Sequence, residues 1–194
     1  QLYNLKLTAG EADVAMWFPQ FDSMELYKAN ELQGGYSTLV ASYPNECAGG
    51  FSFNQAYQED MVIGDLLRNI DFRRAVSLGY DRDDMNNTLF FGLAETHPTA
   101  PLKSMPWWSD TFWNDYYEFD LDGANQMLDD LGLDQRDGEG YRLLPDGRRL
   151  TLTLTGDYEY YNIQAEMIIC DMNDLGIEII YKLLDPSAFG AAVA

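Results

Sequence analysis

One stretch of the sequence decides the fold, residues 150–184, which read LTLTLTGDYEYYNIQAEMIICDMNDLGIEIIYKLL. Residues 150–155 alternate leucine with threonine, and a period of two predicts a β-strand. Residues 161–175 then predict a helix that Gly176 ends, and residues 177–184 predict a second strand. A strand, a helix and a strand in this order favour a right-handed parallel crossover. The sequence therefore predicts an α/β domain in which helices flank a mixed sheet.

Upstream of this unit, the pattern predicts further helices and strands. Helices are expected where a capping residue precedes an apolar stripe and a glycine follows it. They span residues 24–32, 69–80, 81–91 and 120–131. Strands are expected over 2–16 in two short pieces, and over 36–42, 49–54 and 141–144. The prolines between residues 95 and 115 predict an irregular loop, because proline breaks both kinds of hydrogen-bond ladder.

The charge balance excludes several classes of partner. The chain has 194 residues, with 12 Lys plus Arg against 32 Asp plus Glu, which gives a formal net charge of −20. Such a chain repels nucleic acid and anionic membrane surfaces. Hydrophobic residues make up 46% of the sequence, so the chain has the apolar material that disordered segments lack. We interpret the acids as a solvated outer surface, and no apolar run is long enough to span a membrane.

Localisation and redox state cannot be taken from the first residues or from the cysteines. Residues 1–10 have no apolar core of a secretory signal, so we expect that any export signal has been removed or was never present. The two cysteines, Cys47 and Cys170, are too few and too far apart for a metal knuckle or a disulfide scaffold. One bridge and two free thiols both remain open at this point.

Motifs for catalysis are weak. The single histidine, His97, lies in the proline-containing loop, and we interpret it as a partly exposed loop residue rather than a catalytic base. Residues 134–146 look superficially like a calcium loop, but with Gly140 at the turn the first ligand position is Gln135 and the last is Asp146. The leading Asp and the closing Glu are both missing, so two β-turns are expected instead. No phosphate loop or dinucleotide fingerprint is present. We therefore expect no catalytic residues, no metal and no cofactor, while Trp107 and Trp108 are expected near a surface cleft.

Residues 69–82, NIDFRRAVSLGYDR, carry a family resemblance. They closely resemble the segment D-x-R-x-R-x-A-l-x-x-a-x-D-R of the extracellular solute-binding proteins of family 5, the oligopeptide- and dipeptide-binding group that serves ABC importers. Asp71 departs from the pattern, because arginine is common there. Five further segments resemble family motifs in the same order, and they lie at residues 9–15, 51–54, 119–132, 146–152 and 175–185.

The resemblance implies a fold and a function. The implied fold is that of a type II periplasmic binding protein, which has two lobes. Residues 1–46 would be the end of the first lobe and the crossing segment. Residues 47–194 would be most of the second lobe, incomplete at its C-terminus. The function implied is a non-enzymatic, monomeric receptor outside the cytoplasm, lipid-anchored in some full-length forms. It would bind a peptide or other small solute and pass it to an ABC transporter permease.

The resemblance also implies where ligand binds. The strand just after the crossing faces the cleft in this family, so the expected ligand-binding residues are Gly49, Gly50, Phe51, Ser52, Phe53 and Asn54. An extended peptide can add to such a strand edge. The aromatic cluster of the loop, and not the resemblance, adds Trp107 and Trp108. We expect one of Phe51 and Phe53 to face the core, and Cys170 to be a buried free thiol. Cys47 lies at the crossing.

Two alternatives remain. The first is an acidic extracellular carbohydrate-binding module or glycoside hydrolase, in which the aromatic loop stacks sugars and two carboxylates act. The second keeps the receptor fold and changes the ligand to a sugar, a metal chelate or an opine.

Overall fold

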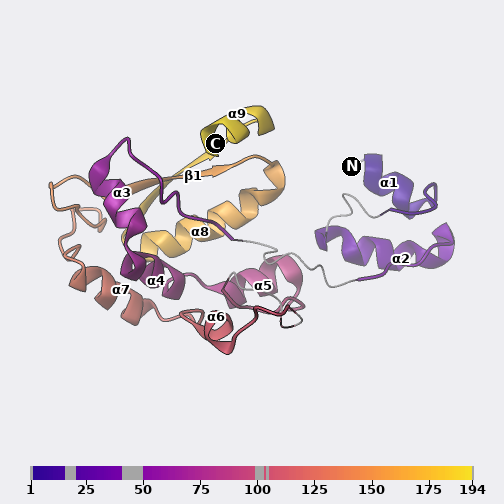
Figure 1. The fold of residues 1–194 in the computed structure, drawn as a ribbon. Helices are drawn as coiled ribbons and strands as arrows, with labels where there is room; N and C mark the ends of the chain where they lie inside the picture. The colour runs from indigo at the N-terminus through magenta and orange to yellow at the C-terminus, as the bar shows by residue number, and fades with distance from the viewer. Residues whose placement is uncertain (1, 16–20, 41–49, 99–102, 104, 194) are drawn as a thin grey trace.

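The computed structural model describes residues 2–15, 21–40, 50–98, 103 and 105–193. These residues form a main body and, apart from it, a pair of helices near the N-terminus (Figure 1). Cys47 and Gly49 lie outside the described residues. Among the described residues, no helix combines the length and the apolar character that crossing a membrane would require.

The parallel crossover is confirmed. Strand β1 (Thr151–Gly156) pairs with β2 (Glu178–Leu183) in parallel, with Thr151 opposite Glu178 and Gly156 opposite Leu183. Helix α8 (Asn162–Asp174) connects the two strands after a short 3-10 turn, η2 (Glu159–Tyr161). Gly176 has a φ of +74°, which glycine adopts without a steric cost and which lets the chain leave α8 for β2. The α/β class that residues 150–184 predict is therefore the class observed.

Four helices of the body each begin at a side chain that caps them. They are α3 (Met61–Arg68), α4 (Ile70–Leu78), α5 (Arg82–Phe90) and α7 (Leu121–Asp130). Their N-caps Asp60, Asn69, Asp81 and Asp120 accept hydrogen bonds from backbone N–H groups of the first turn. Such a cap contributes about 1 kcal/mol. Helices α4, α5 and α7 agree with the sequence prediction, whereas α3 was not expected.

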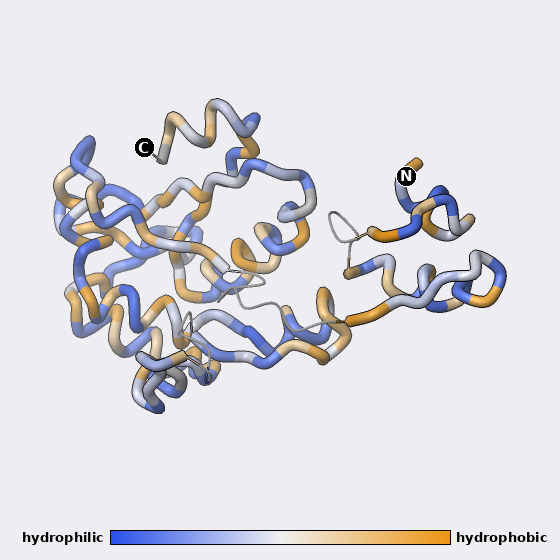
Figure 2. The backbone as a smooth tube through the Cα atoms, turned by 45° about the vertical axis from the view of Figure 1, so that its right-hand side comes forward, coloured by the Kyte–Doolittle hydropathy of each residue, from blue (hydrophilic) through white to orange (hydrophobic). Residues whose placement is uncertain are grey.

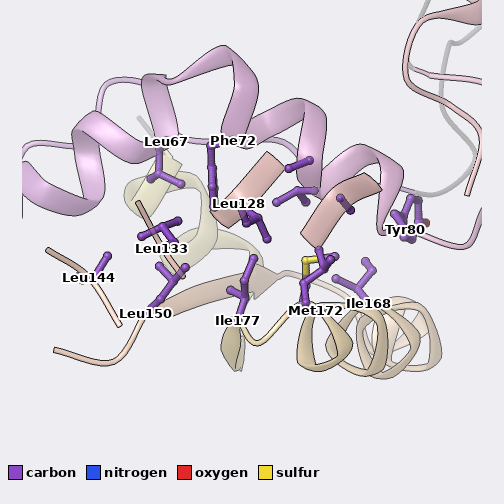
Figure 3. Packing of buried hydrophobic residues seen from close by; sticks show 14 of the residues in the cluster. Leu67, Phe72, Tyr80, Leu128, Leu133, Leu144, Leu150, Ile168, Met172 and Ile177 are labelled. Atoms are coloured by element: carbon purple, nitrogen blue, oxygen red, sulfur yellow. The ribbon is translucent and has the colours of Figure 1, made fainter. Parts of the chain in front are cut away.

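The core lies between these helices and the crossover. Phe72, Leu128, Leu150, Leu175 and Ile177 have no measurable solvent exposure. Side chains from α3 and α4 point toward those of the sheet and α8, with Leu128 of α7 between them (Figure 3). Burial of one such side chain contributes about 1.5–3 kcal/mol, so this layer is the main source of stability.

The N-terminal pair consists of α1 (Leu2–Thr8) and α2 (Met24–Gly34), with the turn η1 (Phe21–Ser23) before α2. Both views show it standing apart from the body (Figures 1 and 2). The Tyr27 hydroxyl donates to the Asn4 side chain at 2.8 Å and joins the two helices. In this pair, Tyr27 is the one described residue that is buried. The contact with the body is aromatic, because the ring of Phe21 lies 5.9 Å from those of Phe90 and Phe91.

Several expected strands are wrong. The described part of 2–16 contains α1, and residues 36–40 form no ladder because side chains of α2 take their backbone groups. Glu31 accepts the Thr38 N–H, and Lys28 donates to the Thr38 carbonyl. Residues 50–54 pair with no strand among the residues that the structure describes, and 141–144 make only isolated bridges. The alternating patterns there report which side chains are buried, not that a neighbouring strand exists.

Two helices and one cysteine also differ from expectation. The loop over 95–115 contains a short helix, α6 (Asp110–Asn114), and α9 (Pro186–Val193) follows β2. Cys170 is free and exposed, so its expected burial is wrong. The buried face of α8 is formed by Gln164, Ala165, Ile168 and Met172, and position 170 lies off that face.

A fully buried arginine joins three parts of the body. The Arg142 side chain has no exposed surface, and its N–H groups donate to five acceptors. Nε donates to the Leu175 carbonyl, Nη1 to Asp129 and the Leu133 carbonyl, and Nη2 to both oxygens of Asn125. The backbone N–H of Arg142 adds a bond of 2.7 Å to the Gly176 carbonyl. Helix α7, the exit of α8 and the segment before β1 are therefore fixed to one guanidinium group.

Substitution of this arginine tests its structural role. Arg142→Met is expected to lower the free energy of unfolding by about 3 kcal/mol, because buried carbonyl oxygens lose their donors. Asp129→Asn is the matched control and should cost less than about 1 kcal/mol, since the Asp129 side chain is 46% exposed. Denaturant unfolding measures both values. Equal stability of Arg142→Met and the parent chain would contradict this role.

A second substitution tests a buried acid. Asp171 on α8 accepts a hydrogen bond of 3.1 Å from the backbone N–H of Asp81, the N-cap of α5. Burial raises the pKa of Asp171 to about 6 from an ordinary value of 3.8, and the charges of Asp81, Asp174 and Asp84 act in the same direction. Between these pH values the folded chain binds more protons than the unfolded chain, so the free energy of unfolding falls as the pH rises.

Asp171→Asn is therefore expected to stabilise the chain at neutral pH. The amide oxygen can still accept the Asp81 N–H, and the cost of the buried charge is removed. After allowance for solvent screening, the gain should be about 1 kcal/mol near neutral pH and close to zero near pH 3.5. Denaturant unfolding at both pH values checks this, with the exposed Asp134→Asn as control. A loss of stability at neutral pH would refute the assignment.

Candidate ligand-binding site

A cleft of about 440 Å³ opens beside α5, the helix whose Phe90 meets the ring of Phe21 from the N-terminal helix pair. Its walls come from residues 50–53, from α4 and α5, and from residues 94–98 of the following loop. Four parts of the chain thus converge on one hollow, which is the usual arrangement of a small-molecule site.

Aromatic rings form the floor of the cleft. The ring of Phe51 lies 5.6 Å from that of Phe53 and 5.7 Å from that of Tyr80, both edge to face. Phe53 also contacts Phe72 of the core at 6.1 Å. Edge-to-face pairs of this kind add about 0.5–1.5 kcal/mol each and hold the rings in place. Both Phe51 and Phe53 are half-buried and pack on the core, so the expectation that one of them faces it is wrong. Residues i and i+2 of an extended chain share a face.

Arg82 fixes the wall between α4 and the loop before α7. Its guanidinium donates to the Ser77 carbonyl at 2.8 Å, to the Ser77 hydroxyl at 2.7 Å and to the Tyr117 carbonyl at 3.2 Å. The Ser77 hydroxyl in turn donates to the Tyr116 carbonyl at 2.6 Å. Arg82 also lies over the ring of Tyr80, 5.0 Å from its centre. These bonds hold α4, α5 and the loop in one arrangement around the cleft.

The rim of the cleft is fixed by polar side chains of α5. The Asn86 side chain donates to the Ala94 carbonyl and accepts the Ala94 N–H, both at 3.0 Å. Thr96 donates to Asp83 at 3.0 Å. His97 lines the cleft, and its Nδ1 lies 2.5 Å from the Pro98 carbonyl, so Nδ1 carries the proton and donates. The expectation of a partly exposed loop histidine is confirmed.

The residues expected to bind ligand are divided by the structure. Gly50, Phe51 and Phe53 line the cleft, whereas Ser52 and Asn54 are exposed and do not. Asn54 accepts the Ala56 N–H in a turn. Trp107 is 62% exposed and lies outside the cleft lining. Trp108 is half-buried outside it as well, and its indole N–H has no hydrogen-bond partner in the part of the chain that the structure describes.

Sequence reasoning missed the rim residues and a second hollow. The sequence predicts one irregular loop here and does not single out its first residues as a rim. Asn86, on the preceding helix, is the available signal, because Asn side chains commonly hydrogen-bond to the backbone of a turn. The second hollow, of about 610 Å³, is open and is formed by residues 157–159 and 183–186. These residues follow β1 and β2 directly, and ligands of α/β proteins bind at the carboxyl ends of parallel strands. The predicted crossover was the signal that could have identified it.

The acids near residues 134–146 are engaged in structure. Arg149 donates to Asp137 and Glu139 at 2.6 Å and to Glu178 at 2.9 Å. Two turns are present as expected, closed by the Gly140 N–H to the Asp137 carbonyl and the Gly147 N–H to the Leu144 carbonyl. Among the described residues, no three potential metal ligands lie close enough together to hold an ion.

Comparison with known proteins identifies the family. The model of the bacterial extracellular solute-binding proteins, family 5 Middle, matches residues 3–193. The periplasmic alpha-galactoside-binding protein of Rhizobium meliloti (strain 1021) is 30% identical over 137 residues, which are 68% of this chain and 20% of the relative.

Solved structures agree with this match. The oligopeptide-binding protein OppA is 30% identical with a TM-score of 0.78, covering 98% of this chain and 31% of its own. The periplasmic binding protein MelB of Agrobacterium fabrum C58, in complex with stachyose, shares the fold at 23% identity and a TM-score of 0.68, covering 97% of this chain and 30% of its own. The chain thus spans less than a third of the length of these relatives. It belongs to family 5 of the bacterial extracellular solute-binding proteins.

Proposed function

We propose that the chain is the ligand-binding part of a receptor that delivers a solute, most simply a peptide, to the permease of an ABC importer. The receptor is a monomer outside the cytoplasm, free or held by a lipid anchor. Residues 1–46 contribute the end of a first lobe and the crossing, and residues 47–194 contribute most of the second lobe. The observation that carries the proposal is the cleft beside α5 with its aromatic floor.

The proposed binding works by closure of two lobes on the solute. A solute that contacts both lobes stabilises the closed state, and the permease recognises that state. In the lobe described here, Gly50, Phe51 and Phe53 form the contact surface, while Ser52 and Asn54 face solvent beside it. Gly49, Trp107 and Trp108 remain proposed contacts of the solute. Aromatic rings suit this role, since they offer large contact area with few rotatable bonds.

A second candidate is the same receptor with an oligosaccharide as its solute. The alpha-galactoside-binding relative and the stachyose complex favour it. A glycoside hydrolase is less well supported, because hydrolysis uses two carboxylates across the substrate and the described lining of the cleft contains one, Glu95. We therefore propose binding without catalysis.

The first experiment compares two lengths of protein. The 194-residue chain alone is expected to bind peptides weakly, with millimolar dissociation constants, because contacts from the other lobe are missing. The longer receptor that contains it should bind in the micromolar range or tighter. Calorimetry with a pool of short peptides and, separately, with stachyose measures both. Micromolar binding of a peptide by the chain alone would contradict the two-lobe proposal, and binding of neither solute class by the longer receptor would contradict the function.

The second experiment tests the cleft itself. Phe90 lines the cleft and is half-buried, so Phe90→Ala in the longer receptor removes contact area for the solute. We expect about fivefold weaker binding, as the loss of one aromatic contact gives. Phe112→Ala is the matched control, because Phe112 is 57% exposed and lies outside the cleft. Unchanged affinity of Phe90→Ala together with a loss in Phe112→Ala would move the site elsewhere.

A further inference from the structure

One aromatic ring of the cleft has a second neighbour outside it. Phe90, at the end of α5, lines the cleft, and its ring also lies 5.9 Å from that of Phe21, with the two planes tilted by 51°. Phe21 begins the turn η1 before α2 and lies outside the described lining of the cleft. A solute in the cleft and the N-terminal helix pair would therefore contact the same side chain.

The residue after Phe90 has a backbone conformation that is unusual for its type. Phe91 ends α5 with a φ of +54° and a ψ of +29°, in the left-handed region where glycine is the usual residue at a helix C-terminus. Within the described residues, Tyr116 is the one other non-glycine residue with a positive φ. A residue with a side chain adopts this conformation at a cost in energy, so it persists only where its surroundings hold it.

The contacts that hold Phe91 come from α5 and from the helix pair. The Asn86 carbonyl accepts the backbone N–H groups of Phe91 and Gly92, which fixes the turn. The ring of Phe91 lies 5.9 Å from that of Phe21, at an interplanar angle of 31°. Among the described helices and strands, η1 on α5 is the most extensive packing between the helix pair and the body. Phe21, Phe90 and Phe91 together form the aromatic contact between these two parts.

We propose that Phe21 is a positioning residue of the solute site, which acts through Phe90. The ring of Phe21 holds the N-terminal helix pair against α5 and limits the positions that the Phe90 ring can take in the wall of the cleft. A solute that packs on Phe90 orders the same ring from inside the cleft. Each event lowers the entropy cost of the other, so solute binding and docking of the helix pair favour each other by the same factor.

This inference rests on the proposed function, because it takes Phe90 as a contact of the solute. It adds that a residue outside the cleft contributes to the affinity for the solute. A contact with a purely structural role would hold the helix pair in place and leave that affinity unchanged. Two measurements separate these roles.

The first measurement is the distance between α2 and α8 in the 194-residue chain, from electron spin resonance of two spin labels. The labels are attached at the exposed Cys170 and at Gln33→Cys, which is exposed on α2, in a chain that also carries Cys47→Ser. The parent should give a single narrow distance distribution, and Phe21→Ala should lose it. Phe21→Tyr keeps the ring and should restore it. Leu32→Ala is the matched control, because Leu32 on α2 is 98% exposed.

A further variant tests the strained residue. Phe91→Gly removes the backbone strain and the ring together. We expect α5 to stay folded, as measured by circular dichroism, while the distance distribution broadens as it does in Phe21→Ala. A narrow distribution in Phe91→Gly would contradict the role of the Phe91 ring.

The second measurement is the affinity for a solute, followed by backbone amide NMR signals of residues 50–53 and 94–98. The probes are the tripeptide alanyl-phenylalanyl-alanine and stachyose, each titrated to millimolar concentration. Phe21→Ala should bind the accepted probe about threefold more weakly than the parent, and Phe21→Tyr should bind it as the parent does. Denaturant unfolding of the body should be the same in the parent and in Phe21→Ala, because Phe21 lies outside the hydrophobic core.

The outcomes distinguish this inference from the function on which it rests. Equal distance distributions in the parent and in Phe21→Ala would overturn the inference, and so would a loss of affinity that Leu32→Ala shares. Binding of a probe with equal affinity by the parent and Phe21→Ala would refute the positioning role and leave the receptor function intact. Absence of binding with both probes would contradict the proposed function and the inference together.

Discussion

The body depends on the buried guanidinium of Arg142. Its five donors satisfy carbonyl and side-chain oxygens from α7, from the exit of α8 and from the turn after α7, while the guanidinium itself has no exposed surface. Lysine could not do this, because it lacks the planar set of five donors. The position of β2 beside β1, and of α4 on α7, follows from this one fixed point together with the apolar core.

The floor and the rim of the cleft are attached to the body in different ways. The floor is continuous with the hydrophobic core, because the ring of Phe53 packs against that of Phe72. The rim is held to α5 by side-chain hydrogen bonds, and the N-terminal helix pair meets α5 through the ring of Phe21. A floor that belongs to the core, with a rim held by a few side-chain bonds, suits a receptor that must release what it binds.

The crossover and the capped helices could be predicted from sequence, because their signals are local. The Leu and Thr alternation, Gly176, and the caps Asn69, Asp81 and Asp120 each act within a few residues. The strands expected at 36–42 and 49–54 are wrong over their described residues, 36–40 and 50–54, because pairing depends on a neighbour that the pattern does not encode. Arg142 could not be found this way, since its importance comes from the distant groups that surround it. Gly50, Phe51 and Phe53 were placed at the cleft through family resemblance, not through periodicity.

All arginines of the chain donate to partners within the protein, namely Arg68, Arg73, Arg74, Arg82, Arg136, Arg142, Arg148 and Arg149. The guanidinium groups of the arginines are thereby engaged in contacts within the protein, while most of the acidic side chains face water. Such a molecule behaves in solution as a polyanion with a surrounding layer of mobile cations. Dissolved salt compresses that layer and weakens the mutual repulsion of the carboxylates, so at neutral pH the ionic strength of the surroundings governs how closely two copies can approach.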